Sequence, residues 1–137
     1  MEIYYRDNYE INLLSAEQYK YYHDKDRIPH INCWWWLRSP GDYSDFTAGV
    51  DDNGSVDFRG CRIDYVDGAV RPVLKISDGR KYEIGKRVIL YNFPWIIIDE
   101  GLAIAEMPIG FQRFDSKSND YENSEIRKFL LNWIIER

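Results

Sequence analysis

Apolar residues recur at helical spacing near the end of the chain and form short runs or alternations through most of the rest. One stripe near the C-terminus follows the spacing i, i+3, i+4, i+7, i+8, with members Ile126, Phe129, Leu130, Trp133 and Ile134. This stripe predicts a helix over about residues 121–135, with Asn119 or Asp120 as its N-cap. Packing into a core is the simplest interpretation of the stripe.

A second, shorter helix is predicted over about residues 15–23. Ser15 and Gln18 have the spacing of a capping box, in which the Ser hydroxyl and the Gln side chain each satisfy a backbone N–H. The buried side of this helix is expected to carry Leu14, Tyr19 and Tyr22. A charged turn and Pro29 follow, so the helix is not expected to continue.

The segments between the helices favour β-strands. Asn53-Gly54 lies between the segments 46–50 and 56–58 and predicts a hairpin with a type I′ turn, whose two central residues need positive φ. Residues 68–76 predict one strand, in which Pro72 marks a bulge, a start or an edge. Three further strands are predicted as a meander: 86–91, 95–99 and 102–106. The expected class is α+β, with a mainly antiparallel sheet and two helices.

Length and charge restrict the classes of protein to consider. A chain of 137 residues is expected to form a single domain, 1–137. The net charge of −5 disfavours binding to nucleic-acid phosphates. No apolar run is long enough to cross a membrane, and Met1–Asp7 lacks the pattern of a signal peptide, so a cytoplasmic location is expected. Cys33 and Cys61 are expected to be free thiols, with one bridge between them as the alternative.

Two motifs resemble a known family. The segment Trp35–Gly41 reads WWLRSPG, and Val70–Leu74 reads VRPVL. Together with Leu13–Glu17 and Ala48–Val50, they resemble an uncharacterised domain family of Gram-positive bacteria and their phages, marked by WWLRSPG and a later GVRPAL segment. That family is similar to C-type-lectin-like and formylglycine-generating-enzyme folds. The resemblance therefore implies a C-type-lectin-like fold.

The order of the matching segments is exchanged. Residues 1–76 resemble the C-terminal half of the family, whereas 82–137 resemble its N-terminal half. The resemblance implies a circular permutant, in which residues 77–81 join the strands around positions 76 and 88 as an adjacent hairpin pair. A homodimer with exchanged halves is the alternative.

Candidate binding residues concentrate in and around the region 38–70. In an extended Trp34–Trp36 segment, Trp35 faces opposite its neighbours, so Trp34 or Trp36 can be exposed for stacking. The predicted binding set is Trp34, Trp36, Arg38, Tyr43, Phe58, Arg59, Arg62 and Tyr65. The predicted structural set is Arg38, Arg71, Trp35, Trp95 and Trp133. The two arginines are expected to hold backbone carbonyls or an acid, with a carboxylate contact as the functional alternative.

Known catalytic and metal-binding patterns do not fit the chain. An EF-hand loop aligned on Gly54 would need an Asp at Gly49 and a Glu at Gly60. Cys33 and Cys61 lie too far apart for the cysteine pair of formylglycine-generating enzymes. His23 and His30 with scattered acids are the remaining option for a metal or acid–base site. We expect no catalytic residues, no cofactor and no obligatory metal.

These observations favour a noncatalytic recognition module that binds a protein or a small ligand through the 38–70 region. One alternative is a small acidic phage-encoded inhibitor of a host protein. Another is a weak carbohydrate binder that uses exposed tryptophan. The identity of the partner is not predicted, and neither nucleic acid nor a membrane is expected as one.

Overall fold

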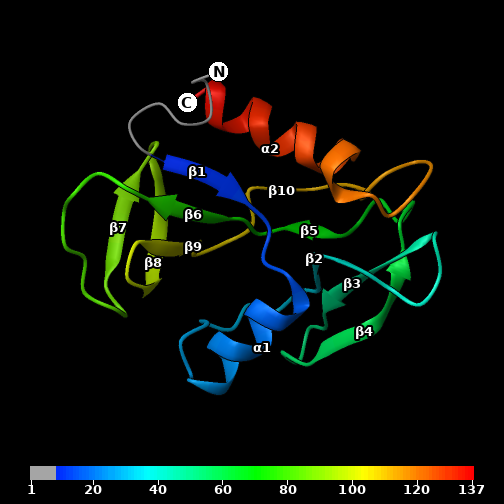
Figure 1. The fold of residues 1–137 in the computed structure, drawn as a ribbon, viewed down its shortest axis with the longest axis horizontal. Coiled ribbons are helices and arrows are strands. Elements are labelled where there is room, and N and C mark those ends of the chain that lie inside the picture. Colours follow the sequence, from blue (N-terminus) through cyan, green and yellow to red (C-terminus); the bar gives the residue numbers. More distant parts are fainter. Residues whose placement is uncertain (1–8) are drawn as a thin grey trace.

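The computed structural model describes residues 9–137 as two five-stranded sheets with two α-helices (Figure 1). The segment Met1–Asp7, which was expected not to be a signal peptide, lies outside the described residues. The elements are β1 (Tyr9–Asn12), α1 (Ala16–Asp24), β2 (Trp35–Pro40), β3 (Phe46–Val50), β4 (Val56–Arg62), β5 (Ala69–Val70), β6 (Val73–Ile76), β7 (Arg87–Leu90), β8 (Phe93–Asp99), β9 (Leu102–Ala105), β10 (Gly110–Phe111), the 3₁₀ turn η2 (Tyr121–Asn123) and α2 (Glu125–Ile135).

The first sheet has the strand order β1-β6-β9-β8-β7 and the second has the order β10-β5-β2-β3-β4. Every pair is antiparallel except β2 with β5. The helices lie on opposite sides of the two sheets, with α2 at the top of Figure 1 and α1 at the bottom. The predicted α+β class, with two helices and mostly antiparallel strands, is confirmed. No helix within residues 9–137 has the length and apolar character needed to cross a membrane.

Residues 71–72 carry the chain from one sheet to the other. The single strand predicted over 68–76 is wrong, because β5 ends at Val70 in the second sheet and β6 begins at Val73 in the first. Pro72 has no N–H to donate to a ladder, so a break between strands is a position where it costs no hydrogen bond. Its carbonyl accepts a bond of 2.9 Å from Ala105 N, which ties the crossover to the end of β9. The crossover therefore holds Arg71 between the two sheets.

The capping box of α1 is confirmed. Ser15 Oγ accepts a hydrogen bond from Gln18 N at 3.0 Å, and Gln18 Oε1 accepts one from Ser15 N at 2.8 Å. Leu14, Tyr19 and Tyr22 are all buried, as the pattern predicts.

The cap of α2 differs from the prediction. Ser124, not Asn119 or Asp120, caps this helix by accepting a bond of 3.1 Å from Arg127 N. Residues 121–123 form a separate 3₁₀ turn, because Ser124 has an extended backbone with φ −81° and ψ 157°. The hydroxyl of Tyr121 in this turn donates to Asn12 Oδ1 of β1 at 2.7 Å. The predicted stripe is buried except for Phe129, which is half-buried.

The β3–β4 hairpin is confirmed, but its turn type is not. Val50 pairs with Val56 across a five-residue turn, which is closed by a bond from Asp51 N to Ser55 O at 2.8 Å. Gly54 has a φ of +89°, but Asn53 is not among the residues with positive φ. Asn53 instead accepts a bond from Ser55 N through its side chain, which shapes the turn without a type I′ backbone.

The strands around positions 76 and 88 lie in the same sheet but are not adjacent. Two strands, β9 and β8, separate β6 from β7. Both sides of β6 are already occupied, by β1 and by β9, because the three-strand meander folds back onto β6 through its last strand. Residues 77–81 are therefore not a hairpin turn, and this part of the expected topology is wrong. Both sheets combine strands from 1–76 and 82–137 of one chain.

The three consecutive tryptophans divide between two hydrophobic clusters, as the extended pattern predicts. Trp35 packs with α1, whereas Trp36 packs with α2 and the first sheet, and half-buried Trp34 packs against that same cluster. Cys33 and Cys61 are half-buried free thiols, which confirms the simpler expectation.

Candidate functional site

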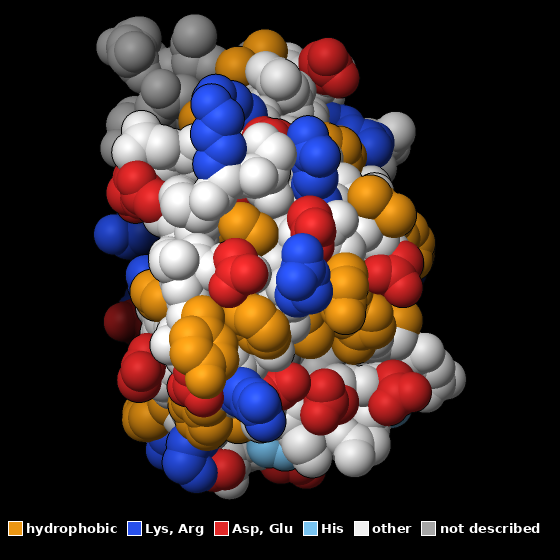
Figure 2. Space-filling view, turned by 90° about the vertical axis from the view of Figure 1, so that its right-hand side faces the viewer, with side chains coloured by type: hydrophobic (Ala, Val, Ile, Leu, Met, Phe, Trp, Pro, Cys, Tyr) orange, Lys and Arg blue, Asp and Glu red, His pale blue; other side chains and the backbone are white. Residues whose placement is uncertain are grey.

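The side of the molecule formed by β3, β4 and their neighbouring loops carries exposed aromatic rings. Tyr43, Phe58 and Tyr65, which belong to the predicted binding set, are 61%, 51% and 47% exposed. Figure 2 shows this side of the molecule, where hydrophobic side chains lie among acidic and basic ones. Arg59 is also exposed, and Arg62 is exposed but paired with Asp64 at 3.1 Å. The surface is therefore mixed in character.

Two members of the predicted binding set are engaged inside the protein. Trp36 is fully buried and donates from Nε1 to Gln112 O at 2.9 Å, so it does not present a ring for stacking. Arg38 donates from Nε to Leu13 O at 3.1 Å and from Nη2 to Gln18 Oε1 at 3.2 Å. Arg38 thus links β2 to the capping box of α1, which is the expected structural role.

The other predicted structural residues lie in the core. Trp35 and Trp95 are buried, and Trp133 packs edge-on against Trp95 with ring centroids 6.1 Å apart. Trp95 also donates from Nε1 to Leu90 O at 2.9 Å. These three rings fix the packing of α1 and α2 on the sheets.

A groove on the surface is lined by two residues of the predicted binding set and by three acids that were not predicted to bind. It has a volume of about 360 Å³. Its lining residues are Trp34, Asp51, Asp52, Asn53, Cys61, Tyr65 and Asp67. They come from the segment before β2, the β3–β4 turn, the end of β4 and the loop after it. We call this the acidic groove, because none of the described residues that line it is Lys or Arg.

The electrostatic character of the acidic groove appears in two of its groups. Burial raises the pKa of Asp51 above its ordinary value of 3.8, and the nearby charges of Asp57 and Asp52 raise it further. Burial together with Asp57, Asp51 and Asp67 raises the pKa of the Cys61 thiol to about 11. Both shifts have the sign expected of anions crowded without a compensating cation. The Cys61 thiol is therefore protonated near neutral pH.

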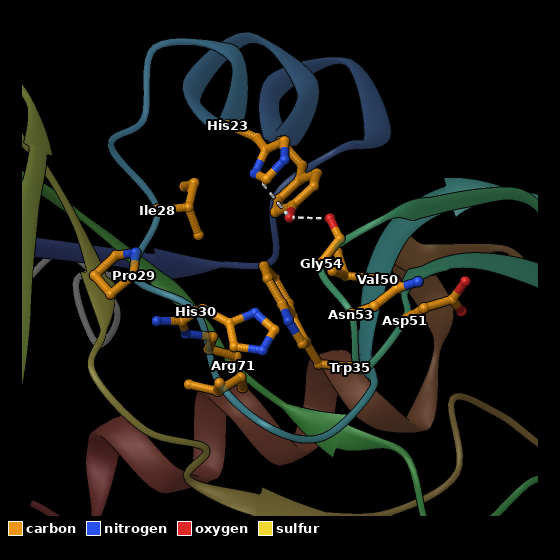
Figure 3. A pocket seen from close by; sticks show the side chains of 12 residues that line it. His23, Ile28, Pro29, His30, Trp35, Val50, Asp51, Asn53, Gly54 and Arg71 are labelled. Atoms are coloured by element: carbon orange, nitrogen blue, oxygen red, sulfur yellow. Dashed lines mark hydrogen bonds between the residues drawn. The ribbon is translucent and has the colours of Figure 1, made fainter.

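A second, smaller pocket lies on the other side of the β3–β4 turn (Figure 3). Its volume is about 60 Å³, and it shares Asp51 and Asn53 with the acidic groove. The remaining lining residues are Tyr19, His23, Ile28, Pro29, His30, Ile31, Trp35, Val50, Gly54 and Arg71. We call this the Arg71 pocket.

The turn and α1 are joined across the Arg71 pocket. The hydroxyl of Tyr19 donates to Gly54 O at 2.6 Å and lies 3.2 Å from His23 Nδ1 (Figure 3). A Cβ added at Gly54 would lie 3.6 Å from His30 Nδ1 and 3.9 Å from His23 Cε1. The fold thus brings both histidines to one glycine, a proximity that their sequence positions do not reveal.

Arg71 is a buried cation of the second pocket and is 1% exposed. Its Nε donates to Ala105 O at 2.8 Å, and its guanidinium lies 5.1 Å from the centroid of the Trp35 ring. Its Nη2 is buried and has no hydrogen-bond partner, and none of the ion pairs among residues 9–137 includes Arg71. Burial lowers the pKa of Arg71 to about 10. The predicted contact with a backbone carbonyl is present.

The two histidines do not form part of a larger ligand set. Within the described part of the chain, no three His, Cys, Asp or Glu side chains are grouped so that they hold a metal ion. His23 and His30 were considered for a metal or acid–base site on sequence grounds. The structure places both among the residues that line the Arg71 pocket, with His23 stacked on the ring of Tyr19. The chain matches no protein-family model, and comparison with curated proteins and with solved structures found no similar protein.

Proposed function

We propose that the protein is a noncatalytic recognition module that binds a basic protein segment in the acidic groove. One observation carries the proposal: the rings of Trp34 and Tyr65 and the carboxylates of three aspartates line one groove, and no cation of the described residues lines it. Trp34 and Tyr65 belong to the set that the sequence predicts for binding. The groove therefore gives the predicted 38–70 region a defined chemistry.

A cationic side chain matches this groove for two physical reasons. An ammonium or guanidinium over an aromatic face gains about 0.5–2 kcal/mol, depending on its exposure. A cation also relieves the repulsion of Asp51 by Asp57 and Asp52, which, after burial, contributes to the raised pKa of Asp51. Aromatic residues add contact area at a low cost in conformational entropy. A Lys or Arg side chain satisfies both kinds of lining residue at once.

The acidic groove has the size to hold one side chain of a protein partner, and it lies next to further exposed side chains. A volume of about 360 Å³ falls in the range of sites that hold a small ligand or one large side chain. The exposed side chains of Phe58 and Arg59, on the neighbouring strand β4, offer additional contact area. A basic anchor residue in the groove with a wider mixed surface around it is a common arrangement of protein interfaces.

The C-type-lectin-like fold and the circular permutation are part of the same proposal. In support, β6 from residues 1–76 pairs with β9 from residues 82–137, so the two matching segments build one sheet. Further support is that the candidate surface lies on a hairpin and loops held by sheets, as binding surfaces often do. The permutation we propose joins the old ends through residues 77–81 without direct pairing of β6 and β7.

Titration with short peptides tests the proposed function. We expect an acetylated and amidated Arg- and Lys-rich peptide to bind, and a peptide of the same length with Asp and Glu in those positions not to bind, as measured by calorimetry. Tyr65→Ala is expected to weaken the basic peptide about fivefold, because it removes one aromatic face. Tyr43→Ala is the matched control, since Tyr43 is exposed but does not line the groove.

Equal affinity for both peptides, or an equal effect of the two tyrosine substitutions, contradicts the proposal. The two alternative functions give distinct outcomes of related tests. An inhibitor of a host protein binds a folded basic partner through the same groove and releases it in moderate salt. If the protein is a carbohydrate binder, neutral glycans are expected to change the fluorescence of Trp34, and the charge of a peptide is expected not to affect its affinity.

A further inference from the structure

The Arg71 pocket contains a buried positive charge whose hydrogen-bonding capacity is incompletely used. The side chain is 1% exposed, one nitrogen is bonded to Ala105 O, and Nη2 has no partner. A guanidinium has five N–H donors and is a strong partner for carboxylates. A buried donor without an acceptor costs free energy, and more so when the group is charged. The unpaired nitrogen therefore needs an explanation beyond packing.

The surroundings of Arg71 do not supply the missing acceptor. Tyr19 already donates its hydroxyl proton to Gly54 O, and the Trp35 ring contributes only its face to the guanidinium. Glu106 acts on Arg71 electrostatically, but it forms its ion pair with Arg87 at 2.7 Å. The neighbours of the guanidinium are thus committed elsewhere, and a pocket opens beside it.

We propose that the Arg71 pocket binds the carboxylate of a short aliphatic acid, with Arg71 Nη2 donating to it. The site goes beyond the proposed function and does not depend on the acidic groove. Ile28, Ile31 and Val50 provide apolar walls for a short hydrocarbon part. His23 and His30 also line this pocket, and both are exposed to solvent.

Size and charge both select a small monoanion. A volume of about 60 Å³ holds about four or five water-sized groups, comparable to the non-hydrogen atoms of acetate or propionate. One guanidinium balances one negative charge, and Asp51 lines the same pocket, so a dianion such as phosphate meets additional repulsion. The same carboxylate chemistry is available from a free acid or from the C-terminus of a peptide ending in Gly.

Thermal unfolding and NMR titration of the unaltered chain test this inference. Acetate and propionate are expected to raise the melting temperature at fixed ionic strength, since a ligand that binds the folded state stabilises it. Acetamide has nearly the same shape without the charge and is expected to give no rise. Both acids are expected to shift the Trp35 indole signal. A peptide that ends in a free Gly carboxylate is compared with its amidated form. A larger rise in melting temperature with the free carboxylate shows that the C-terminus of a peptide also binds in the Arg71 pocket.

Arg71→Met tests whether the guanidinium of Arg71 binds the carboxylate or only packs in the core. Loss of the charge-assisted bond is expected to weaken acetate binding about tenfold or more. Arg71→Lys, which retains the charge, is expected to retain part of the binding. If Arg71→Met does not fold, the comparison of acetate with acetamide on the unaltered chain still decides. Equal responses to acetate and acetamide, or an acetate response that persists in folded Arg71→Met, overturn the proposal.

Discussion

The acidic groove and the Arg71 pocket share one turn but have opposite electrostatic character. Asp51 and Asn53 line both, while Asp52 and Asp67 lie on one side and Arg71 on the other. The groove is open, and two of its acids are exposed. The charge in the pocket is almost fully removed from water. The comparison shows how a single hairpin turn separates two regions of opposite charge.

The difference in burial sets the size of the effects expected at each site. Exposed charges are screened by water and salt, so each acid of the groove contributes little alone. A buried guanidinium is hardly screened, so its loss changes binding far more. Substitutions in the shared turn are expected to affect both sites. They therefore test most directly whether the two sites respond differently.

The largest effect is expected from Gly54→Val. Gly54 has a φ of +89°, where a β-branched residue is strained, so we expect a loss of about 2 kcal/mol in the free energy of unfolding. Because the turn carries Asp51 and Asn53, binding at both sites is expected to weaken. Urea unfolding and the two titrations measure these effects.

Gly79→Val is the matched control for the turn substitution. Gly79 has a φ of +80°, and no atom lies within 4 Å of an added Cβ, so the backbone strain is similar and the sites are untouched. If Gly79→Val impairs binding as much as Gly54→Val, the effect reflects global destabilisation and not the shared turn.

Asp51→Asn is expected to act on the two sites in opposite directions. Removing this charge weakens attraction for a basic peptide in the groove and relieves repulsion of a carboxylate in the Arg71 pocket. We expect about two- to fivefold lower affinity for the peptide and a similar gain for acetate. Asp64→Asn, which alters an acid paired with Arg62 outside both sites, is the control. A change of the same sign at both sites contradicts the account.

The smallest expected effect is a change in the pH at which affinity for a basic peptide begins to fall. Because the pKa of Asp51 is raised above 3.8, its charge is lost at a higher pH than that of an isolated aspartate. Affinity for a basic peptide of constant charge is present above that raised pKa and is expected to fall as the pH falls through it. In Asp51→Asn the decline is expected to begin at lower pH. Calorimetry between about pH 7 and pH 4 checks this order.

Local sequence patterns predicted the elements better than their arrangement. The capping box at Ser15 and the stripe of α2 depend on residues a few positions apart, and the structure confirms both. The pairing of β6 with β1 and β9 depends on distant segments, and no local pattern encodes which strand fills each side. The assignment of β7 as the neighbour of β6 was wrong for that reason.

The site was predicted in part, for the same physical reason. Trp34 was identified from the alternation of an extended segment, and Tyr65 from its place in the mixed 38–70 region. Asp51 and Asp52 fell within the EF-hand alignment around Gly54 that was rejected, and they were not assigned to binding, because their convergence with Asp67 depends on how β4 returns to the sheet. The unpaired nitrogen of Arg71 follows from the position of this residue at the crossover between the sheets. The crossover was not predicted, because residues 68–76 were expected to form one continuous strand.

Amide chemical-shift mapping of a basic peptide titration tests the central claim most directly. If the peptide binds in the acidic groove, the largest shifts are expected at Asp51, Asp52, Cys61, Tyr65 and Asp67, together with the Trp34 indole. Signals of β7, which lies at the far edge of the other sheet, are expected to stay in place. Shifts centred on β7, or spread evenly over the surface, would contradict binding in the acidic groove.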